Sequence, residues 1–468
     1  MRKWFPLLAA CLGTLILLID VTIVTVALPD IAADLETGLS GLQWVVDGYA
    51  LALAALLLVF GALADRLGAK YLYLTGLAVF AVASLACGIA GSVTILIAAR
   101  AIQGLGGAAM FATTLSLLHA TYTGRDRGIA FGAWGAVAGA AAGLGMVLGG
   151  VLTDLLSWRW IFLVNLPIAA VAIIMSAMVF PASRRQPARG VDVPGMVAFA
   201  IAATALVFGI IRGGEHGWTD TVAVLALLVG VLATALFAQI ESRSTAPIFP
   251  LALLRNRFFG ATLIGAAGQT FAGFASAPLL SLWLQQQLHL SPLRAGLAML
   301  PMAAAAFLVS GVLGRHLHAL APRWSIGASL VLIGVGTGLL TLISVESSWV
   351  ALIPGFLVIG VGVGVSSPAL VAVGMAAVPP QQSGTAAGAV NTARQLGLAM
   401  GVAVLGSVFH RVGGADHAVD LASFIDGLNA ACLVASVVGV VLGLLAFALF
   451  QRRTPATSTD ISDAVLVG

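Results

Sequence analysis

The sequence predicts an all-α polytopic membrane protein with fourteen transmembrane helices, arranged as two six-helix bundles plus two inserted helices. Two properties of the whole chain predict this class. Its 468 residues are 60% hydrophobic and only 9% charged, whereas soluble domains carry about 25% charged residues. Its apolar stretches are continuous rather than alternating, and several exceed the roughly 18 residues that a helix needs to cross a bilayer.

Charged residues and Pro/Gly turns separate the apolar stretches and give the expected spans. The first half has six, at 5–28, 44–64, 71–91, 94–118, 128–151 and 159–180. Two inserted spans follow at 193–211 and 219–240. The second half has six more, at 257–286, 293–314, 324–344, 348–376, 384–410 and 427–450.

These spans divide the chain into four parts. We expect an N-terminal six-helix bundle at 1–180, a basic linker with two additional helices at 181–250, a C-terminal six-helix bundle at 251–451 and a cytoplasmic tail at 452–468. A weak internal repeat supports the two halves, because GALADRL at 61–67 is similar to GVLGRHL at 311–317. Transporters built from two such halves bind their substrate between them, near the middle of the membrane.

The basic residues orient the spans. If both termini are cytoplasmic, sixteen of the 22 lysines and arginines lie on cytoplasmic segments. These are Arg2, Lys3, Arg66, Lys70, Arg125, Arg127, Arg184, Arg185, Arg189, Arg243, Arg255, Arg257, Arg315, Arg323, Arg452 and Arg453. Outer segments carry Arg159, Arg212, Arg294 and Arg411. This excess follows the positive-inside rule, and a miscounted span would destroy it because every later loop would change sides.

Several function classes lack their motifs. The three cysteines lie in apolar runs far from any CxxC or His cluster, so a disulfide framework or structural zinc is not expected. The sequence has no HExxH or GxSxG motif of an enzyme and no GxxxxGK[ST] phosphate loop of an ATP-driven pump. Basic residues serve as topology signals, so we expect no nucleic-acid partner. We expect no metal and no cofactor, a proton gradient as the energy source, and a functional monomer.

Asp20 is a carboxylate inside the first apolar span. It lies eight to nine residues before Pro29, hence about 12 Å from the expected outer end of that helix. A charge at this depth costs at least about 2.5–3.5 kcal/mol to insert, and removal from water favours the neutral carboxyl, so the group can exchange protons near neutral pH. We favour a proton carrier over the alternative, a structural carboxylate permanently paired with a neighbouring helix.

Two arginines also lie inside spans. Arg100 shares a helix face with Gln103 and either biases the protonation of Asp20, touches substrate, or joins helices as a polar contact. Arg394 meets an anionic substrate group or braces its helix, and the sequence does not decide between these. Asp47 is placed near the outer end of the second span, where water can reach it, so loop capping competes with a substrate or proton role.

The remaining site candidates are polar or aromatic side chains within spans. The candidate substrate-binding residues are Asp47, Gln103, Trp134, Gln269, Phe271, Phe274, Asn391 and Arg394. For the aromatic residues, ordinary packing or a membrane-interface belt is the competing interpretation. In the fifth span Gly139, Gly143, Gly145, Gly149 and Gly150 form small-xxx-small rows, which let helices approach closely, either in a moving seal between the halves or in a static contact.

Together these stretches resemble the major facilitator superfamily, in particular its fourteen-spanner drug/proton antiporter branch. The similar segments are LIDVTIVTVALP (18–29), GALADRLGAK (61–70), RAIQGLGGAA (100–109) and GLGMVLGG (143–150). The resemblance implies the major facilitator fold, with Asp20 coupling protons and Arg100 as its partner. It also implies that Gly61, Asp65, Arg66, Gly68 and Lys70 form the conformational motif of the cytoplasmic gate. Ala69 and Met146 depart from the family pattern, where a basic residue and a proline are usual.

The sequence therefore predicts a proton-coupled exporter that expels small hydrophobic drugs or antibiotics across a bacterial inner membrane by alternating access. Two alternatives remain at this point. The same mechanism can export an endogenous metabolite or amino acid, and a non-transporting membrane sensor or scaffold would need the intramembrane charges only for structure.

Overall fold

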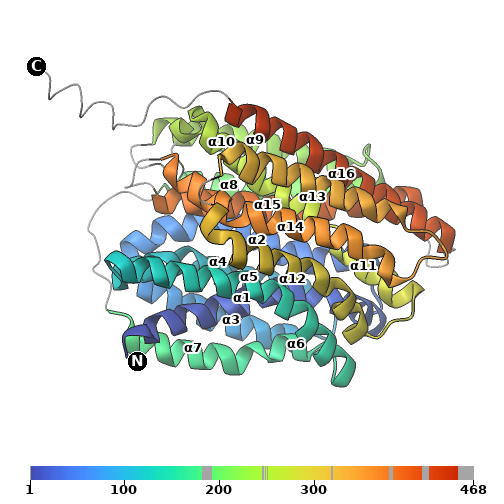
Figure 1. Cartoon of the computed structure of the whole chain (residues 1–468), viewed down its shortest axis with the longest axis horizontal. Coiled ribbons are helices and arrows are strands. Elements are labelled where there is room, and N and C mark those ends of the chain that lie inside the picture. The colour runs from blue at the N-terminus through green and yellow to red at the C-terminus, as the bar shows by residue number, and fades with distance from the viewer. Residues whose placement is uncertain are drawn as a thin grey trace, which may run out of the picture.

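The chain folds into long helices that run side by side along one axis of the molecule (Figure 1). The structure, a computed structural model, describes residues 2–181, 192–244, 247, 249, 251–317, 320–378, 383–413 and 421–451. These residues contain helices, turns and no strand, which confirms the all-α class. The linker at 182–191 and the tail at 452–468 lie outside the described residues.

The first half contains seven helices. They are α1 (Phe5–Asp34), α2 (Leu39–Leu67), α3 (Ala69–Gly88), α4 (Val93–Thr121), α5 (Gly124–Leu155), α6 (Trp160–Leu163) and α7 (Asn165–Val179). The inserted pair is α8 (Val193–His216) and α9 (Thr221–Arg243). The second half contains α10 (Arg257–Gly273), α11 (Ala277–Leu282), α12 (Pro292–Leu317), α13 (Ser329–Leu339), α14 (Leu352–Ala376), α15 (Ser383–Gly413) and α16 (Leu421–Gln451).

Thirteen helical segments among the described residues are long and apolar enough to cross a membrane. Helix α5 is not one of these thirteen segments because its described apolar part covers only Leu144–Leu155. The whole helix has 32 residues. The thirteen spans and α5 correspond one for one to the fourteen predicted spans. The chain is a multi-pass membrane protein.

Three spans differ from the prediction in shape. The first was expected to end at residue 28, but α1 continues through Pro29 to Asp34, because the backbone groups that an interior proline frees in a membrane helix can find other partners. Asp20 is therefore fourteen residues, about 21 Å, from the end of its helix rather than about 12 Å. The span at 257–286 is broken after Gly273 and restarts as α11 with Pro278 in its first turn, where proline is tolerated. The span at 159–180 is divided into α6 and α7.

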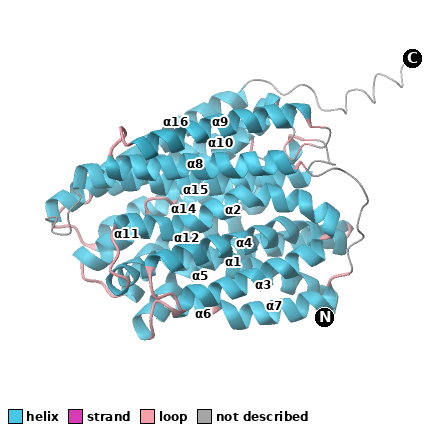
Figure 2. Cartoon of the chain, turned by 180° about the vertical axis from the view of Figure 1, so that it is seen from behind, coloured by secondary structure: helices cyan, strands magenta, loops and turns pink. Residues whose placement is uncertain are grey.

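The two halves pack against each other along α5 with α12 and along α2 with α15. In Figure 1 the blue-to-green helices of the first half lie below the orange and red helices of the second half, and α1 begins at the end of the bundle where α16 finishes. Helix α8 contacts both α15 and α2 and lies beside them when the molecule is seen from behind (Figure 2). The inserted pair thus covers one seam between the halves.

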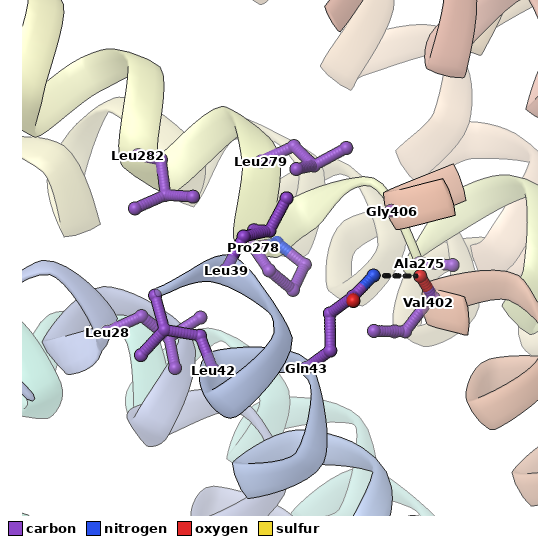
Figure 3. Close-up of a pocket in the computed structure, with 10 residues that line it drawn as sticks. All are labelled: Leu28, Leu39, Leu42, Gln43, Ala275, Pro278, Leu279, Leu282, Val402 and Gly406. Carbon is purple, nitrogen blue, oxygen red and sulfur yellow. Dashed lines mark hydrogen bonds between the residues drawn. The ribbon is translucent and has the colours of Figure 1, made fainter. Parts of the chain in front are cut away.

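At the predicted outer end, described side chains close the seam between the halves. The Gln43 amide of α2 donates to the Val402 carbonyl of α15 over 3.2 Å, beside a small pocket lined by residues of both halves (Figure 3). The Gln285 amide, in the π-helical turn Trp283–Gln287, donates to the Val26 carbonyl of α1 over 2.7 Å. These two bonds join segments that are far apart in the sequence and fix the halves relative to each other at this end.

Candidate functional site

Asp20 lies in the interior of the first half, at the middle of α1, with 0% of its surface exposed. The α1 helix is apolar on all sides, so the carboxylate is in a region from which water is excluded. An isolated charge in such a region is costly unless hydrogen-bond donors or a counter-charge surround it. The structure supplies both.

The counter-charge is Arg100 of α4, which is 1% exposed. Its Nη1 forms an ion pair with Asp20 Oδ2. Its Nε donates to the Val45 carbonyl of α2 over 3.1 Å, and its guanidinium carbon lies 4.2 Å from the centre of the Tyr49 ring. Arg100 therefore has partners that do not depend on Asp20, among them the Tyr49 ring that stacks on its guanidinium.

The other carboxylate oxygen of Asp20 accepts two amide hydrogen bonds. Gln103 Nε2 donates over 2.9 Å and Asn165 Nδ2 over 3.1 Å. Gln103 also accepts from Arg100 Nη1 at 2.8 Å and donates to the Ser84 hydroxyl of α3 at 2.8 Å. Helices α1, α3, α4 and α7 thus meet in one buried polar cluster, the Asp20 cluster, made of Asp20, Ser84, Arg100, Gln103 and Asn165.

Sequence reasoning placed Asp20 and Arg100 together but missed two members of this cluster. Asn165 and Ser84 are single polar residues within apolar runs, FLVNLPIA and VASLAC, and both are buried. Their isolation among apolar residues was the available signal. Gln103 was proposed for substrate binding, and the structure places it in the Asp20 cluster.

A second polar cluster, the Arg394 cluster, lies in the second half between α10, α14 and α15. The Arg394 guanidinium donates from Nε and Nη2 to Gln269 Oε1 over 3.1 and 2.7 Å, and from Nη2 to the Ser367 hydroxyl over 2.9 Å. The Gln269 amide nitrogen donates to Ser366 at 2.6 Å and to Ser367 at 3.0 Å. The Thr270 hydroxyl donates to the Arg394 carbonyl at 2.6 Å.

Asp47 is not where water reaches it, which corrects the expectation from its distance to the helix end. Its side chain is 0% exposed, and neither carboxylate oxygen receives a hydrogen bond from a described residue. It follows Gln43 by one turn and so shares the face of α2 that packs on α15. Helix α2 begins at Leu39 rather than at 44, which leaves Asp47 more than two turns inside the helix.

The aromatic candidates are spread over both halves. The Trp134 indole of α5 donates to the Thr14 hydroxyl of α1 over 2.8 Å, and its ring lies 6.3 Å from that of Phe111. Phe271, on α10, and Phe274, directly after α10, are half-buried and pack against the main hydrophobic core. Asn391 is buried on α15, about one turn before Arg394. The structure thus gathers Gln269 with Arg394 and places Trp134 against the first half.

The loop between α2 and α3 follows the predicted conformational motif in part. Gly68 ends α2 with φ of 91°, a left-handed conformation that glycine adopts without strain. Lys70 Nζ donates to the carbonyls of Ala177 and Phe180 over 2.7 and 2.6 Å, and so holds the end of α7. Asp65 and Arg66 belong to α2, but their side chains lie outside the described residues.

The glycines of α5 pack against two different partners. A Cβ at Gly145 would lie 2.9 Å from the Ile19 carbonyl of α1, and one at Gly149 would lie 2.7 Å from the Ile23 carbonyl. A Cβ at Gly150 would lie 2.6 Å from Leu293 Cα, in α12 of the other half. The surroundings of Gly139 and Gly143 are outside the described residues. The helix runs through Met146, the position of the missing proline, without a break.

Gly149→Ala is expected to lower the stability of the protein because the added methyl group overlaps the α1 backbone. Overpacking of this kind typically costs about 1–3 kcal/mol. The matched control is Gly61→Ala, since a Cβ at Gly61 meets no atom within 4 Å and alanine is the better helix former. Thermal unfolding of the purified variants measures both. Equal melting temperatures for Gly149→Ala and wild type would show that α1 and α5 do not pack as described.

Comparison with known proteins shows the family. The sequence matches the Major Facilitator Superfamily over residues 10–402 and again over 262–464. It is 36% identical to the methylenomycin A resistance protein of Streptomyces coelicolor, covering 91% of each chain. It is 33% identical to the puromycin resistance protein pur8 of Streptomyces alboniger, covering 99% of this chain and 94% of that one.

A solved structure shares the fold. The peptide transporter POT in complex with sulfate superposes with a TM-score of 0.71 at 14% identity, covering 96% of this chain and 94% of that one. Among the described residues no group of three or more His, Cys, Asp or Glu side chains could hold a metal ion. The family match covers most of the chain, and both resistance proteins are more than 30% identical over more than nine tenths of it. The chain belongs to the Major Facilitator Superfamily.

Proposed function

We propose that the protein is a proton-coupled exporter that expels small hydrophobic drugs or antibiotics by alternating access. The observation that carries this proposal is the wholly buried carboxylate of Asp20, held in mid-membrane by Arg100, Gln103 and Asn165. Such a group is costly to insert and is a functional candidate by default. The names of the two antibiotic resistance proteins support drugs as the cargo.

Arg100 keeps other hydrogen-bond partners when Asp20 takes up a proton. Three donors stabilise the ionised carboxylate in this conformation. When the carboxyl is protonated and its bond to Arg100 breaks, the guanidinium keeps the Val45 carbonyl, the Gln103 amide oxygen and the Tyr49 ring. Proton uptake can therefore loosen the contact between α1 and α4 while the guanidinium keeps its hydrogen bonds, and this change is the step that we couple to movement of the halves.

The closed seam at the predicted outer end supplies the other requirement of the mechanism. For export, the substrate enters from the cytoplasm while this end is shut and leaves when it opens. The bonds of Gln43 to Val402 and of Gln285 to Val26 must then break once per cycle. In this proposal the cytoplasmic gate is controlled by the conformational motif of Gly61, Asp65, Arg66, Gly68 and Lys70. Asp47, on the face of α2 that packs on α15, is a further candidate for binding substrate or a proton.

We place the protein in the bacterial cell membrane with both termini cytoplasmic, and we treat the monomer as the functional unit. The start of α1 and the end of α16 lie at the same end of the bundle (Figure 1), which agrees with an even number of spans. The basic residues concentrate on the loops at that end. Both features support cytoplasmic termini and place the Gln43 and Gln285 bonds at the outer end.

A cysteine pair across the closed seam at the predicted outer end tests alternating access. A Cβ at Gly406 would lie 2.5 Å from Gln43 Cδ, so the double variant Gln43→Cys, Gly406→Cys brings two thiols to the same place. With Cys11, Cys87 and Cys432 replaced, oxidation is expected to stop transport, and a reductant to restore it. Each single cysteine variant under the same oxidant is the control. Full transport by the cross-linked protein would contradict opening at this end.

Transport itself is tested in liposomes that contain the purified protein. With an imposed pH gradient, a panel of antibiotics including methylenomycin A and puromycin is expected to show at least one compound that moves uphill against proton flow. No gradient-driven movement of any compound, with the protein shown to be folded, would favour a sensor or scaffold. Uphill movement only of cellular metabolites would favour metabolite export.

A further inference from the structure

The protein contains two arginines deep in its spans, and only one of them has an oppositely charged partner among the described residues. Arg100 forms an ion pair with Asp20 and is almost fully buried. Arg394 contacts only an amide oxygen and a hydroxyl, and no described residue forms an ion pair with it. Amide and hydroxyl partners satisfy hydrogen bonds but leave the positive charge without compensation. An arginine cannot remove that charge by losing a proton.

The Arg394 cluster also contains hydrogen-bond donors that remain free to bind another group. Gln269 is buried, and its nitrogen is held by Ser366 and Ser367, which aims its oxygen at the guanidinium. The described hydrogen bonds of the guanidinium use only Nε and Nη2, so Nη1 is available to another acceptor. Ser367 accepts from both Gln269 and Arg394, and its own proton has no acceptor among the described residues. Free donors from Arg394 and Ser367 therefore lie side by side.

The Arg394 cluster is only partly buried. Arg394, Ser367 and Thr270 are each partly exposed, whereas Arg100 and the rest of the Asp20 cluster are buried. The Arg394 guanidinium bonds to residues of α10 and α14, as expected for a side chain directed into the bundle, since a guanidinium facing lipid would be very costly. A cation and a hydroxyl donor side by side are the groups that recognise a carboxylate.

We propose that Arg394, together with the Ser367 hydroxyl, binds the carboxylate of an acidic hydrophobic substrate, so that the protein prefers carboxylic acids to their neutral analogues. This inference names the substrate class and rests on the proposed function for the direction of transport. It gives Arg394 the counter-charge that no described residue provides. It also separates two roles, with protons handled in the first half and the anionic group of the substrate in the second.

Equilibrium binding to the purified protein, without any gradient, tests the proposal. The probes are three matched pairs: dansylglycine with dansylglycinamide, 1-pyrenebutyric acid with its amide, and 1-naphthaleneacetic acid with its amide. We expect at least one acid to bind about tenfold or more tightly than its amide, the ratio for one charge-assisted hydrogen bond. Arg394→Gln should remove that preference, Arg394→Lys should keep part of it, and Ser367→Ala should reduce it a few-fold.

Arg411→Gln is the matched control, because it removes the same charge from an exposed position on the same helix. It should keep the preference of the wild type. Equal binding of acid and amide in all three pairs, or no binding of any acid, overturns the proposal on the folded wild-type protein alone. Full acid preference in Arg394→Gln also overturns it. If Arg394→Gln does not fold, Arg394→Lys and Ser367→Ala still give the decisive comparison.

The same probes separate this inference from the proposed function. Asp20→Asn should keep the acid preference at equilibrium while losing proton-driven transport. Acid-selective binding without any gradient-driven movement would contradict the exporter and leave the anion site intact. Gradient-driven export of neutral compounds with no acid preference would do the reverse.

Discussion

Asp20→Asn is expected to abolish proton-driven export and to leave a folded protein in the membrane. Asparagine has nearly the same shape, and its oxygen can still accept from Arg100, but it cannot carry a proton. Arg100 retains the Val45 carbonyl, the Gln103 oxygen and the Tyr49 ring. It therefore keeps these contacts while its buried charge loses its partner, and the variant should be less stable than the wild type but still folded. Uphill efflux in liposomes with a pH gradient should fall to the level of empty liposomes, while downhill substrate exchange continues.

Asp34→Asn is the matched control for this experiment. Asp34 ends the same helix and pairs with Arg159 over 2.6 Å, but both side chains are substantially exposed. Exposed ion pairs contribute only about 0–1 kcal/mol, so this variant should transport normally. Undiminished gradient-driven efflux by Asp20→Asn would reject Asp20 as the proton carrier. Loss of transport in both variants would point to a general effect of altering α1.

Arg100→Gln is expected to destabilise the protein. It leaves a buried carboxylate that retains only the amides of Gln103 and Asn165. Breaking a buried ion pair from one side typically costs about 3–5 kcal/mol because the other charge is left without compensation. Thermal unfolding of the purified variant, and its yield of monodisperse protein, should show this loss. Arg159→Gln, which removes a partly exposed guanidinium, is the control.

The double variant Asp20→Asn, Arg100→Gln separates stability from transport. Removing both charges should restore much of the stability lost in Arg100→Gln, because no buried charge remains unpaired. Transport should stay absent, because no group in the cluster can then carry a proton. A double variant as unstable as Arg100→Gln would mean that the arginine acts mainly by packing. A double variant that exports against a gradient would contradict the proton role of the whole cluster.

The fold was largely predictable because each membrane-spanning helix is specified by its own stretch of sequence. Each span needs its own run of apolar residues, and basic loops alternate with neutral ones, so the order of helices could be worked out segment by segment. Helix ends were predicted less well: α1 continues past Pro29 and the span at 257–286 breaks after Gly273. These endings depend on neighbouring helices that satisfy the backbone, which local sequence does not show.

The candidate site was predictable in its charges and not in its connections. Asp20 and Arg100 stand out in the sequence because a charge in an apolar run is costly and rare. Asn165 and Ser84, which complete the cluster, carry no charge and gave no comparable signal. Asp47 was placed near water by its distance from the helix end, yet its face of α2 turns toward α15 and is fully buried.

Composition and spacing along the chain were thus enough to show a multi-pass helical membrane protein with a carboxylate and two arginines inside it, since the cost of moving each residue out of water is a property of that residue and its immediate neighbours. The rotation of each helix about its axis depends on how all the helices pack together. That rotation decided which charges meet: it joined Asp20 to Arg100, left Arg394 with neutral partners among the described residues, and buried Asp47 completely.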